Sequence, residues 1–285
     1  MHNTFNIGID LGGTNLRGGI VHENALQKII SRRINAKGST QEVLEELFSI
    51  TDQLINKSVT SIGIGVPGLV NAEKGIIYDV VYIPSWKEVP LQKWMEDRYQ
   101  IPVFVDNDAN CFALGEYYFG KGKRYDSLIG LTIGTGLGSG IIINKKLYTG
   151  KNGGAGEFGM IDYLDHCYEY YASGQFFQNI YQTDGEVVFK DAKSGDATAI
   201  KMYKEMGSHL GKFIKMILYS LDVELIIIGG SVRQAWPWFN ETMWVQIQTF
   251  AFQKSLQHFQ MEISELENAG ILGAAALQYD FENKK

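Results

Sequence analysis

Cysteine and long apolar runs are both scarce in this sequence of 285 residues. Its two cysteines, Cys111 and Cys167, cannot form a disulfide framework, and this usage fits a reducing cytoplasm. The longest aliphatic stretches, such as residues 225–228, are far too short to span a membrane. The first residues also lack the basic and apolar segments of a signal peptide. We therefore expect a cytoplasmic chain without a membrane partner.

Positive charge is also in short supply. The chain has 26 basic and 32 acidic residues, which gives a net charge of −6. This balance argues against nucleic acid as a partner. An acidic protein that binds a polyphosphate must do so with local backbone donors and a metal ion, because its overall field repels the ligand. The length indicates about two domains.

Glycine, in contrast, is concentrated in two similar hairpins, at residues 5–21 and 128–143. Each consists of an apolar strand, a turn of glycine and threonine, and a second apolar strand. Such turns let backbone N–H groups approach an anion that a Cβ would hold away. The residues predicted to hold phosphate are Gly12, Gly13, Thr14 and Asn15 in the first turn and Gly134, Thr135 and Gly136 in the second. Two such turns predict a two-domain phosphotransferase.

A third glycine turn follows the apolar strand at residues 223–228 and contains Gly229, Gly230 and Ser231. We predict that it holds the sugar and base of a nucleotide. Many α/β proteins have a turn of this kind, so this motif is weaker than the two hairpins.

Several carboxylates are placed where phosphoryl transfer needs them. Asp10, beside the first turn, is predicted to hold Mg²⁺ through water; a plain hairpin aspartate is the alternative. Asp108 is predicted to accept a proton from an attacking hydroxyl that Asn107 orients. The alternative for residues 106–110 is a simple helix cap. Glu157, among glycines, is suited to vicinal hydroxyls, although residues 153–159 also read as a flexible loop.

The remaining pattern predicts alternating helices and strands. A capping box at residues 39–42 opens a helix, a strand at 101–108 ends in acidic residues, and a long helix covers about 198–221. Residues 120–126 are predicted to be a loop. We expect a smaller N-terminal α/β domain of residues 1–108 plus about 273–285, and a larger C-terminal α/β domain of residues 109–272.

Six motifs in order give the chain a resemblance to a known family, the ROK sugar kinases of the actin/hexokinase/Hsp70 ATPase superfamily, over nearly its whole length. These motifs lie at residues 10–15, 65–68, 105–110, 134–138, 156–159 and 168–174. The resemblance implies two RNase H-like domains around a cleft, the hexokinase/actin-like ATPase fold. It also implies that ATP binds one wall and a sugar the bottom of that cleft.

The resemblance also implies roles for individual residues. Asp108 would be the general base, and Asp10 would serve Mg²⁺. The sugar would be bound by Gly68, Asn107, Asp108, Glu157 and Glu169. The three glycine turns would hold the nucleotide.

One segment departs from the family. Typical relatives have a histidine where this chain has Met160, and a cysteine-rich run that binds structural zinc with it; here that run is missing. Cys167 and His166 cannot supply a closed four-ligand site, so we expect no structural zinc. Tyr163, Tyr168, Tyr170 and Tyr171 are predicted to pack in its place.

Taken together, the sequence predicts ATP-dependent phosphorylation of a hexose, with the 6-hydroxyl of glucose as the default acceptor. Another hexose, an N-acetylhexosamine, or a sugar-sensing role of the same fold without turnover are the alternatives. The expected cofactors are ATP and Mg²⁺, and the expected assembly is a homodimer or a higher homo-oligomer.

Overall fold

The protein is described by a computed structural model that covers residues 4–78, 80 and 82–284. The chain forms two compact units. The first contains residues up to 126, residues 140–155 and residues from 265 onward, and the second contains 127–139 and 156–264. The two domains expected from the sequence, with a boundary near residue 108, remain a prediction, because the two units are defined only by the contacts within each of them.

The first unit is built on a five-stranded mixed sheet with the order β3-β2-β1-β4-β8. β1 pairs antiparallel with β2 and parallel with β4, and β4 runs parallel with β8. The strands are β1 (Phe5–Leu11), β2 (Asn15–His22), β3 (Ala25–Arg33), β4 (Val59–Val66) and β8 (Val103–Asn107). The first glycine hairpin is therefore the β1–β2 pair, as the alternating pattern predicts.

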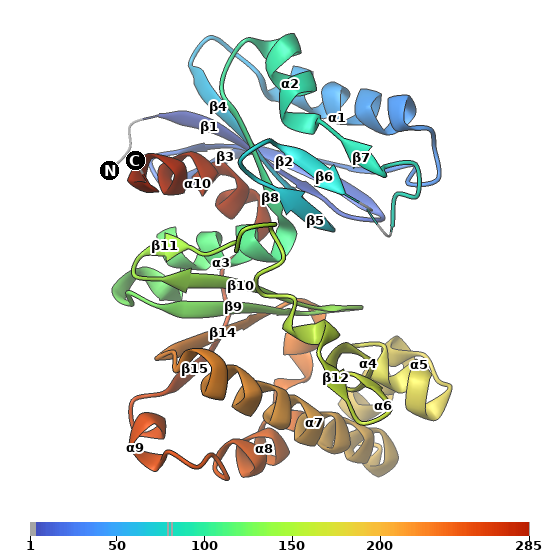
Figure 1. Cartoon of the computed structure of the whole chain (residues 1–285). Helices are drawn as coiled ribbons and strands as arrows, with labels where there is room; N and C mark the ends of the chain where they lie inside the picture. The colour runs from blue at the N-terminus through green and yellow to red at the C-terminus, as the bar shows by residue number, and fades with distance from the viewer. Residues whose placement is uncertain (1–3, 79, 81, 285) are drawn as a thin grey trace. The chain divides into compact units, whose positions relative to one another are not determined.

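Helices pack on both faces of this sheet, with α1 and α2 on one face and α10 on the other (Figure 1). A Cβ at Gly8 would lie 1.9 Å from the carbonyl oxygen of Ile271 in α10, so a glycine is required there. The capping box at Ser39 is confirmed by the Ser39 side chain and Glu42. The helices are α1 (Thr40–Leu54), α2 (Leu91–Tyr99), α3 (Asp108–Tyr118) and α10 (Ala269–Lys284).

Smaller elements complete the first unit. A three-stranded sheet contains β5 (Leu69–Asn71), β6 (Ile76–Tyr78) and β7 (Glu88–Val89). The short strand β11 (Lys146–Leu147) pairs with the end of β10 (Leu137–Ile143). The segment expected to be a loop at residues 120–126 contains a short 3-10 helix, Lys121–Arg124. The Glu116 carboxylate accepts the backbone N–H of Lys121, which helps to start that turn.

The second five-stranded sheet has the order β11-β10-β9-β14-β15, and its strands β9, β14 and β15 belong to the second unit. β14 runs parallel with both β9 and β15. The strands are β9 (Leu128–Ile133), β10 (Leu137–Ile143), β14 (Leu225–Gly229) and β15 (Gln260–Ile263), with a separate hairpin of β12 (Asp162–Tyr163) and β13 (His166–Cys167). The helices are α4 (Tyr168–Ala172), α5 (Phe176–Tyr181), α6 (Gly185–Ser194), α7 (Ala197–Leu221), α8 (Trp236–Ile247) and α9 (Gln253–Leu256).

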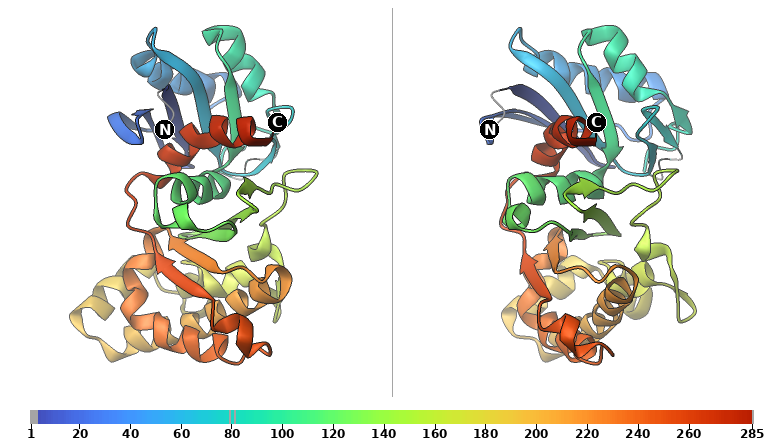
Figure 2. Two further views of the ribbon diagram at one scale, coloured as in Figure 1. Left: turned by 90° about the vertical axis from the view of Figure 1, so that its left-hand side faces the viewer. Right: turned by 60° about the vertical axis from the view of Figure 1, so that its left-hand side comes forward.

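The long helix α7 packs closely against α8 (Figure 1 and Figure 2). Gly207 and Gly211 lie at this contact, where a Cβ would come within 2.4 Å and 2.3 Å of carbonyl oxygens of α8. The predicted apolar face of α7 is confirmed, since Met206, Leu210 and Phe213 are fully buried.

The α/β class, with two main five-stranded sheets, is therefore confirmed. Among the described residues, no helix combines the length and apolar character that crossing a bilayer demands.

Candidate active site

The first glycine turn connects β1 and β2 in the first unit. The N–H of Gly12 donates to the carbonyl oxygen of Asn15 at 2.9 Å, which closes the turn. A Cβ at Gly13 would lie 2.6 Å from Cβ of Tyr82, so the turn tolerates no side chain there. Thr14 and Asn15 are exposed at its tip. This is an open, backbone-rich turn of the kind that accepts a phosphate.

Asp10 precedes this turn and is paired with Arg17. The two residues are direct partners across the β1–β2 ladder, and Nη2 of Arg17 donates to Oδ2 of Asp10 at 2.5 Å. A Cβ on Gly270, near the start of α10, would lie 3.1 Å from the same oxygen. The sequence reasoning missed this ion pair, although the hairpin register carried the signal. Mg²⁺ often binds to one or two carboxylates plus substrate phosphates, and the role of Asp10 in holding such an ion through water stays a prediction.

Asn107 and Asp108 lie at the end of β8 and the start of α3. The side-chain oxygen of Asn107 accepts the N–H of Ala109 at 2.8 Å, so Asn107 is the helix cap that the alternative reading expected. Its amide nitrogen also donates to the carbonyl oxygen of Gly68 at 3.0 Å. Two of the residues predicted to bind sugar are thus in direct contact. Asp108, the first helical residue, is exposed.

The charges of three carboxylates in the first unit shift the pKa of one buried thiol. Burial raises the pKa of Cys111 well above its usual value, and the charges of Asp106, Asp108 and Asp10 raise it further. Asp106 is itself buried, where it accepts the side-chain amide of Asn110 at 2.7 Å. The predicted base and the predicted metal ligand, Asp108 and Asp10, therefore belong to one acidic region.

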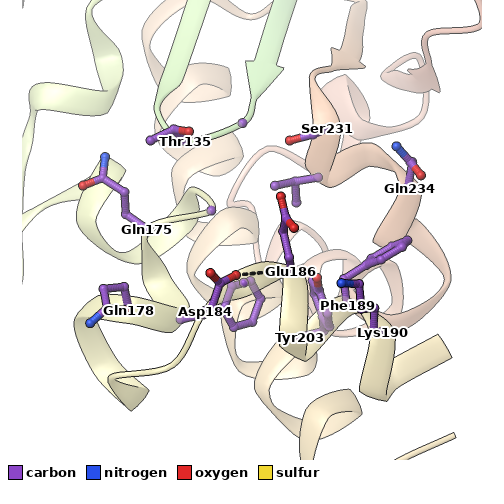
Figure 3. Close-up of a pocket in the computed structure, with 15 residues that line it drawn as sticks. Thr135, Gln175, Gln178, Asp184, Glu186, Phe189, Lys190, Tyr203, Ser231 and Gln234 are labelled. Carbon is purple, nitrogen blue, oxygen red and sulfur yellow. Dashed lines mark hydrogen bonds between the residues drawn. The ribbon is translucent and has the colours of Figure 1, made fainter. Parts of the chain in front are cut away.

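In the second unit, the second and third glycine turns line one pocket of about 570 Å³. Gly134 and Thr135 contribute from the β9–β10 turn and Ser231 from the turn after β14 (Figure 3). Gly230 has a φ of 81°, and a Cβ there would lie 2.2 Å from the carbonyl oxygen of Ile133. The two turns meet because β14 and β9 are neighbouring parallel strands. The buried Gly229 ends β14, and the carbonyl oxygen of Gly136 accepts the N–H of Gly134 at 3.0 Å within the second turn.

The rest of the pocket comes from helices that carry no recognisable motif. Asp184 caps α6 by accepting the N–H of Glu186 at 2.7 Å (Figure 3). Phe189 and Lys190 follow on α6, and Tyr203 comes from α7. Sequence reasoning missed all of these, because helix faces that line a pocket have the same spacing as helix faces that pack in a core.

Glu157 and Glu169 are the two glutamates of the second unit that are predicted to bind the sugar. Although Glu157 is exposed, surrounding protein raises the pKa of its carboxyl group above the usual value, and the charge of Glu169 adds to this shift. Glu169 accepts the N–H of Leu137 at 2.8 Å. The two predicted sugar ligands of this unit therefore lie within electrostatic range of one another.

An aromatic cluster occupies the segment between Tyr163 and Tyr171. Tyr163 stacks on Tyr168 with ring centroids 4.3 Å apart, and its hydroxyl is 3.0 Å from Nδ1 of His209 on α7. Tyr171 packs against both Tyr163 and His209. The predicted packing among these tyrosines is present, and α7 adds a histidine, His209, that the sequence did not link to this cluster. Within the described residues, no group of three or more His, Cys, Asp and Glu side chains is arranged to hold a metal ion.

Comparison with known proteins gives a consistent result. The family model described as the ROK family matches residues 6–280. An N-acetyl-D-glucosamine kinase of Yersinia pseudotuberculosis is 31% identical over 260 residues, covering 79% of this chain and 83% of the relative.

Solved structures match the whole chain. A ROK family glucokinase from Streptomyces griseus, in complex with glucose and AMPPNP, superposes with a TM-score of 0.82 at 27% identity, covering 96% of this chain and 98% of that one. A ROK family transcriptional regulator, a homologue of the Escherichia coli Mlc protein, gives 0.84 at 25% identity, covering 98% and 78%. The fold is therefore that of ROK sugar kinases.

Proposed function

The chain belongs to the ROK family and is an ATP-dependent sugar kinase, and we propose that it phosphorylates the 6-hydroxyl of a hexose with Asp108 as the general base. The observation that carries this proposal is the single pocket into which two of the glycine turns project. Kinases need a place for a nucleotide and a group that takes the acceptor's proton; the pocket supports the first role, and the exposed carboxylate of Asp108 at the start of α3 supports the second.

The donor side of the reaction is assigned to the glycine turns. The pocket of the second unit takes the nucleotide, with Gly134 and Thr135 of its lining at the phosphates and Ser231 at the sugar and base. The neighbouring turn residues Gly136, Gly229 and Gly230 are assigned to the same groups. The turn at residues 12–15 contributes further backbone donors. Asp10 would hold Mg²⁺ through water, and that ion would supply charge stabilisation on the transferred group.

The acceptor side is assigned to polar groups of each unit. Asn107, fixed by its bond to Gly68, orients the sugar, and Asp108 takes the proton of the attacking hydroxyl. Glu157 and Glu169 accept hydrogen bonds from other hydroxyls. Because phosphoryl transfer depends mainly on positioning and electrostatics, these contacts account for most of the proposed catalysis.

A panel of acceptors tests this function. ADP release is measured with ATP, with and without Mg²⁺, for glucose, mannose, fructose, N-acetylglucosamine and N-acetylmannosamine. We expect turnover with at least one sugar, and a 6-phosphate identified by phosphorus NMR of the product. A product carrying phosphate on another hydroxyl would refute the proposed 6-position.

The second candidate is a sugar-responsive regulator, favoured by the likeness to the ROK transcriptional regulator. It predicts that a sugar raises the melting temperature while no sugar in the panel releases ADP. The same panel, read by thermal shift, separates the two candidates. We also propose that the protein is cytoplasmic and that it forms a homodimer or a higher homo-oligomer. Light scattering of the purified protein tests the oligomeric state.

A further inference from the structure

Glu169 touches the glycine turn predicted to hold phosphate. Its Oε2 accepts the backbone N–H of Leu137, the first residue of β10, at 2.8 Å. A Cβ on Gly136 would lie 2.8 Å from the same oxygen, so the carboxylate lies directly against the turn. A negative charge therefore already occupies one of the backbone donors of the second glycine turn.

The same short segment holds the other side of the turn. The N–H of Gly174 donates to the carbonyl oxygen of Gly134 at 2.7 Å. The side-chain amide of Gln175 donates to the other oxygen of Glu169 at 3.4 Å. Gly174 and Gln175 both line the pocket. One carboxylate is thus bonded both to the turn and to the pocket wall.

The charge of Glu169 reaches beyond these bonds, since it also disfavours ionisation of Glu157. Phosphate groups and carboxylates compete for the same backbone donors, and they repel each other at short range. A sugar hydroxyl that donates to Glu169 would draw the carboxylate away from Leu137 and partly satisfy its charge.

We propose that Glu169 couples acceptor binding to donor binding, by blocking the second glycine turn until a sugar hydroxyl takes the carboxylate. This inference rests on the proposed function, because it uses the same sugar and nucleotide assignments. It makes Glu169 a gate for the order of binding as well as a sugar ligand. Sugar then binds first, and the nucleotide binds more tightly to the sugar complex.

Calorimetry with AMPPNP and Mg²⁺, with and without saturating concentrations of the preferred sugar of the panel, tests the coupling. For the unaltered protein we expect sugar to tighten AMPPNP binding by at least about fivefold, within the usual range for linked sites. Glu169→Gln removes the charge and Glu169→Ala removes the acceptor. Both are expected to bind AMPPNP without sugar more tightly than the unaltered protein does, and to respond little to sugar.

Glu157→Gln is the matched control, because it removes the same charge nearby and leaves the bond to Leu137 intact. The proposal is overturned if Glu157→Gln tightens sugar-free AMPPNP binding as much as the Glu169 variants do. It is also overturned if the Glu169 variants bind AMPPNP without sugar more weakly than the unaltered protein does. Amide hydrogen exchange of Leu137 in the unaltered protein gives a second readout should the variants fail to fold. We expect faster exchange with saturating sugar, and unchanged exchange contradicts the gate.

The outcomes also separate this inference from the proposed function. An unaltered protein that phosphorylates a sugar but binds AMPPNP equally well with and without it overturns only the coupling. A protein that binds no nucleotide at all overturns both.

Discussion

Asn107 and Asp108 are neighbours in the chain whose side chains serve different purposes. Asn107 caps α3 and bonds to Gly68, so its role in folding and its proposed role in binding are inseparable. Asp108 lies at the exposed start of the same helix, where its Oδ1 accepts the N–H of Ala109 at 2.9 Å, a bond that an asparagine side chain can keep. The proposed base can therefore be tested by substitution more cleanly than its neighbour.

We expect Asp108→Asn to lower kcat by about 10²–10⁴-fold, because the amide keeps the size of the side chain but cannot take a proton. Steady-state kinetics with the preferred sugar measures this effect, and sugar affinity should change much less. Retention of more than about a third of kcat would be incompatible with general-base catalysis by Asp108. Asp191→Asn is a suitable control, since Asp191 is an exposed aspartate of α6 and is not among the residues that line the pocket.

At this scale the sequence was most informative where the local geometry permits only one residue type. The glycines at 13 and 230 were identifiable because backbone or side-chain atoms lie where a Cβ would be. The contact of Glu169 with Leu137 was not identifiable, because its partners are 32 positions apart and no local pattern reports it. Tertiary proximity of this kind requires the fold.

At the scale of elements, the β12–β13 hairpin and α7 form one aromatic unit. Tyr163 bridges them by stacking on Tyr168 and by its hydrogen bond to His209. Stacked and edge-to-face aromatic pairs stabilise by about 0.5–1.5 kcal/mol each beyond the area that they bury. This packing fixes the segment that leads into Glu169.

The cluster should make stability depend on pH. Burial, and then the charge of Lys212, lower the pKa of His209 from its usual value of 6.5. Because the folded state then prefers the neutral ring, the unfolded state binds the proton first. Stability from this group is present above about pH 6.5 and is lost as pH falls through the lowered pKa, with a slope of at most about 1.4 kcal/mol per pH unit.

Urea unfolding between pH 5 and pH 8 measures this dependence. We expect His209→Gln to be less stable at pH 8 and to lose less stability on acidification than the unaltered protein. His258→Gln, at an exposed histidine, is the matched control and should keep the original slope. Identical slopes for His209→Gln and the unaltered protein would exclude this role for His209.

Periodicity predicted most elements well. The apolar spacing of α7 and the capping box of α1 fixed both helices within a residue or two, since each signal is local. The lining of the pocket by Phe189 and Tyr203 was not predicted. Tyr203 is itself buried with the core residues of α7, and Phe189 follows the buried Val188 on α6, so only the arrangement of the helices shows which side chains reach the pocket.

At the scale of the whole molecule, we expect stability without zinc and activity that requires magnesium. A structural zinc site contributes on the order of 10 kcal/mol, so removing such an ion would lower the melting temperature sharply. Treatment with EDTA should leave the melting temperature unchanged while abolishing turnover, and added Mg²⁺ should restore it. One equivalent of zinc per chain in elemental analysis would contradict this expectation.

The position of α10 has a consequence for how the protein is made. The first unit combines three separate segments, and its last helix packs against β1, β4 and α3. This helix packs on a surface that contains Gly8, Gly63 and Gly115, where a Cβ would meet its carbonyl oxygens. On the ribosome that surface stays uncovered until α10 emerges. The second unit, in contrast, is complete once residue 264 has left the exit tunnel. Domains usually fold in order from the N-terminus during synthesis. Here the half of the protein that is translated first is the half that finishes folding last.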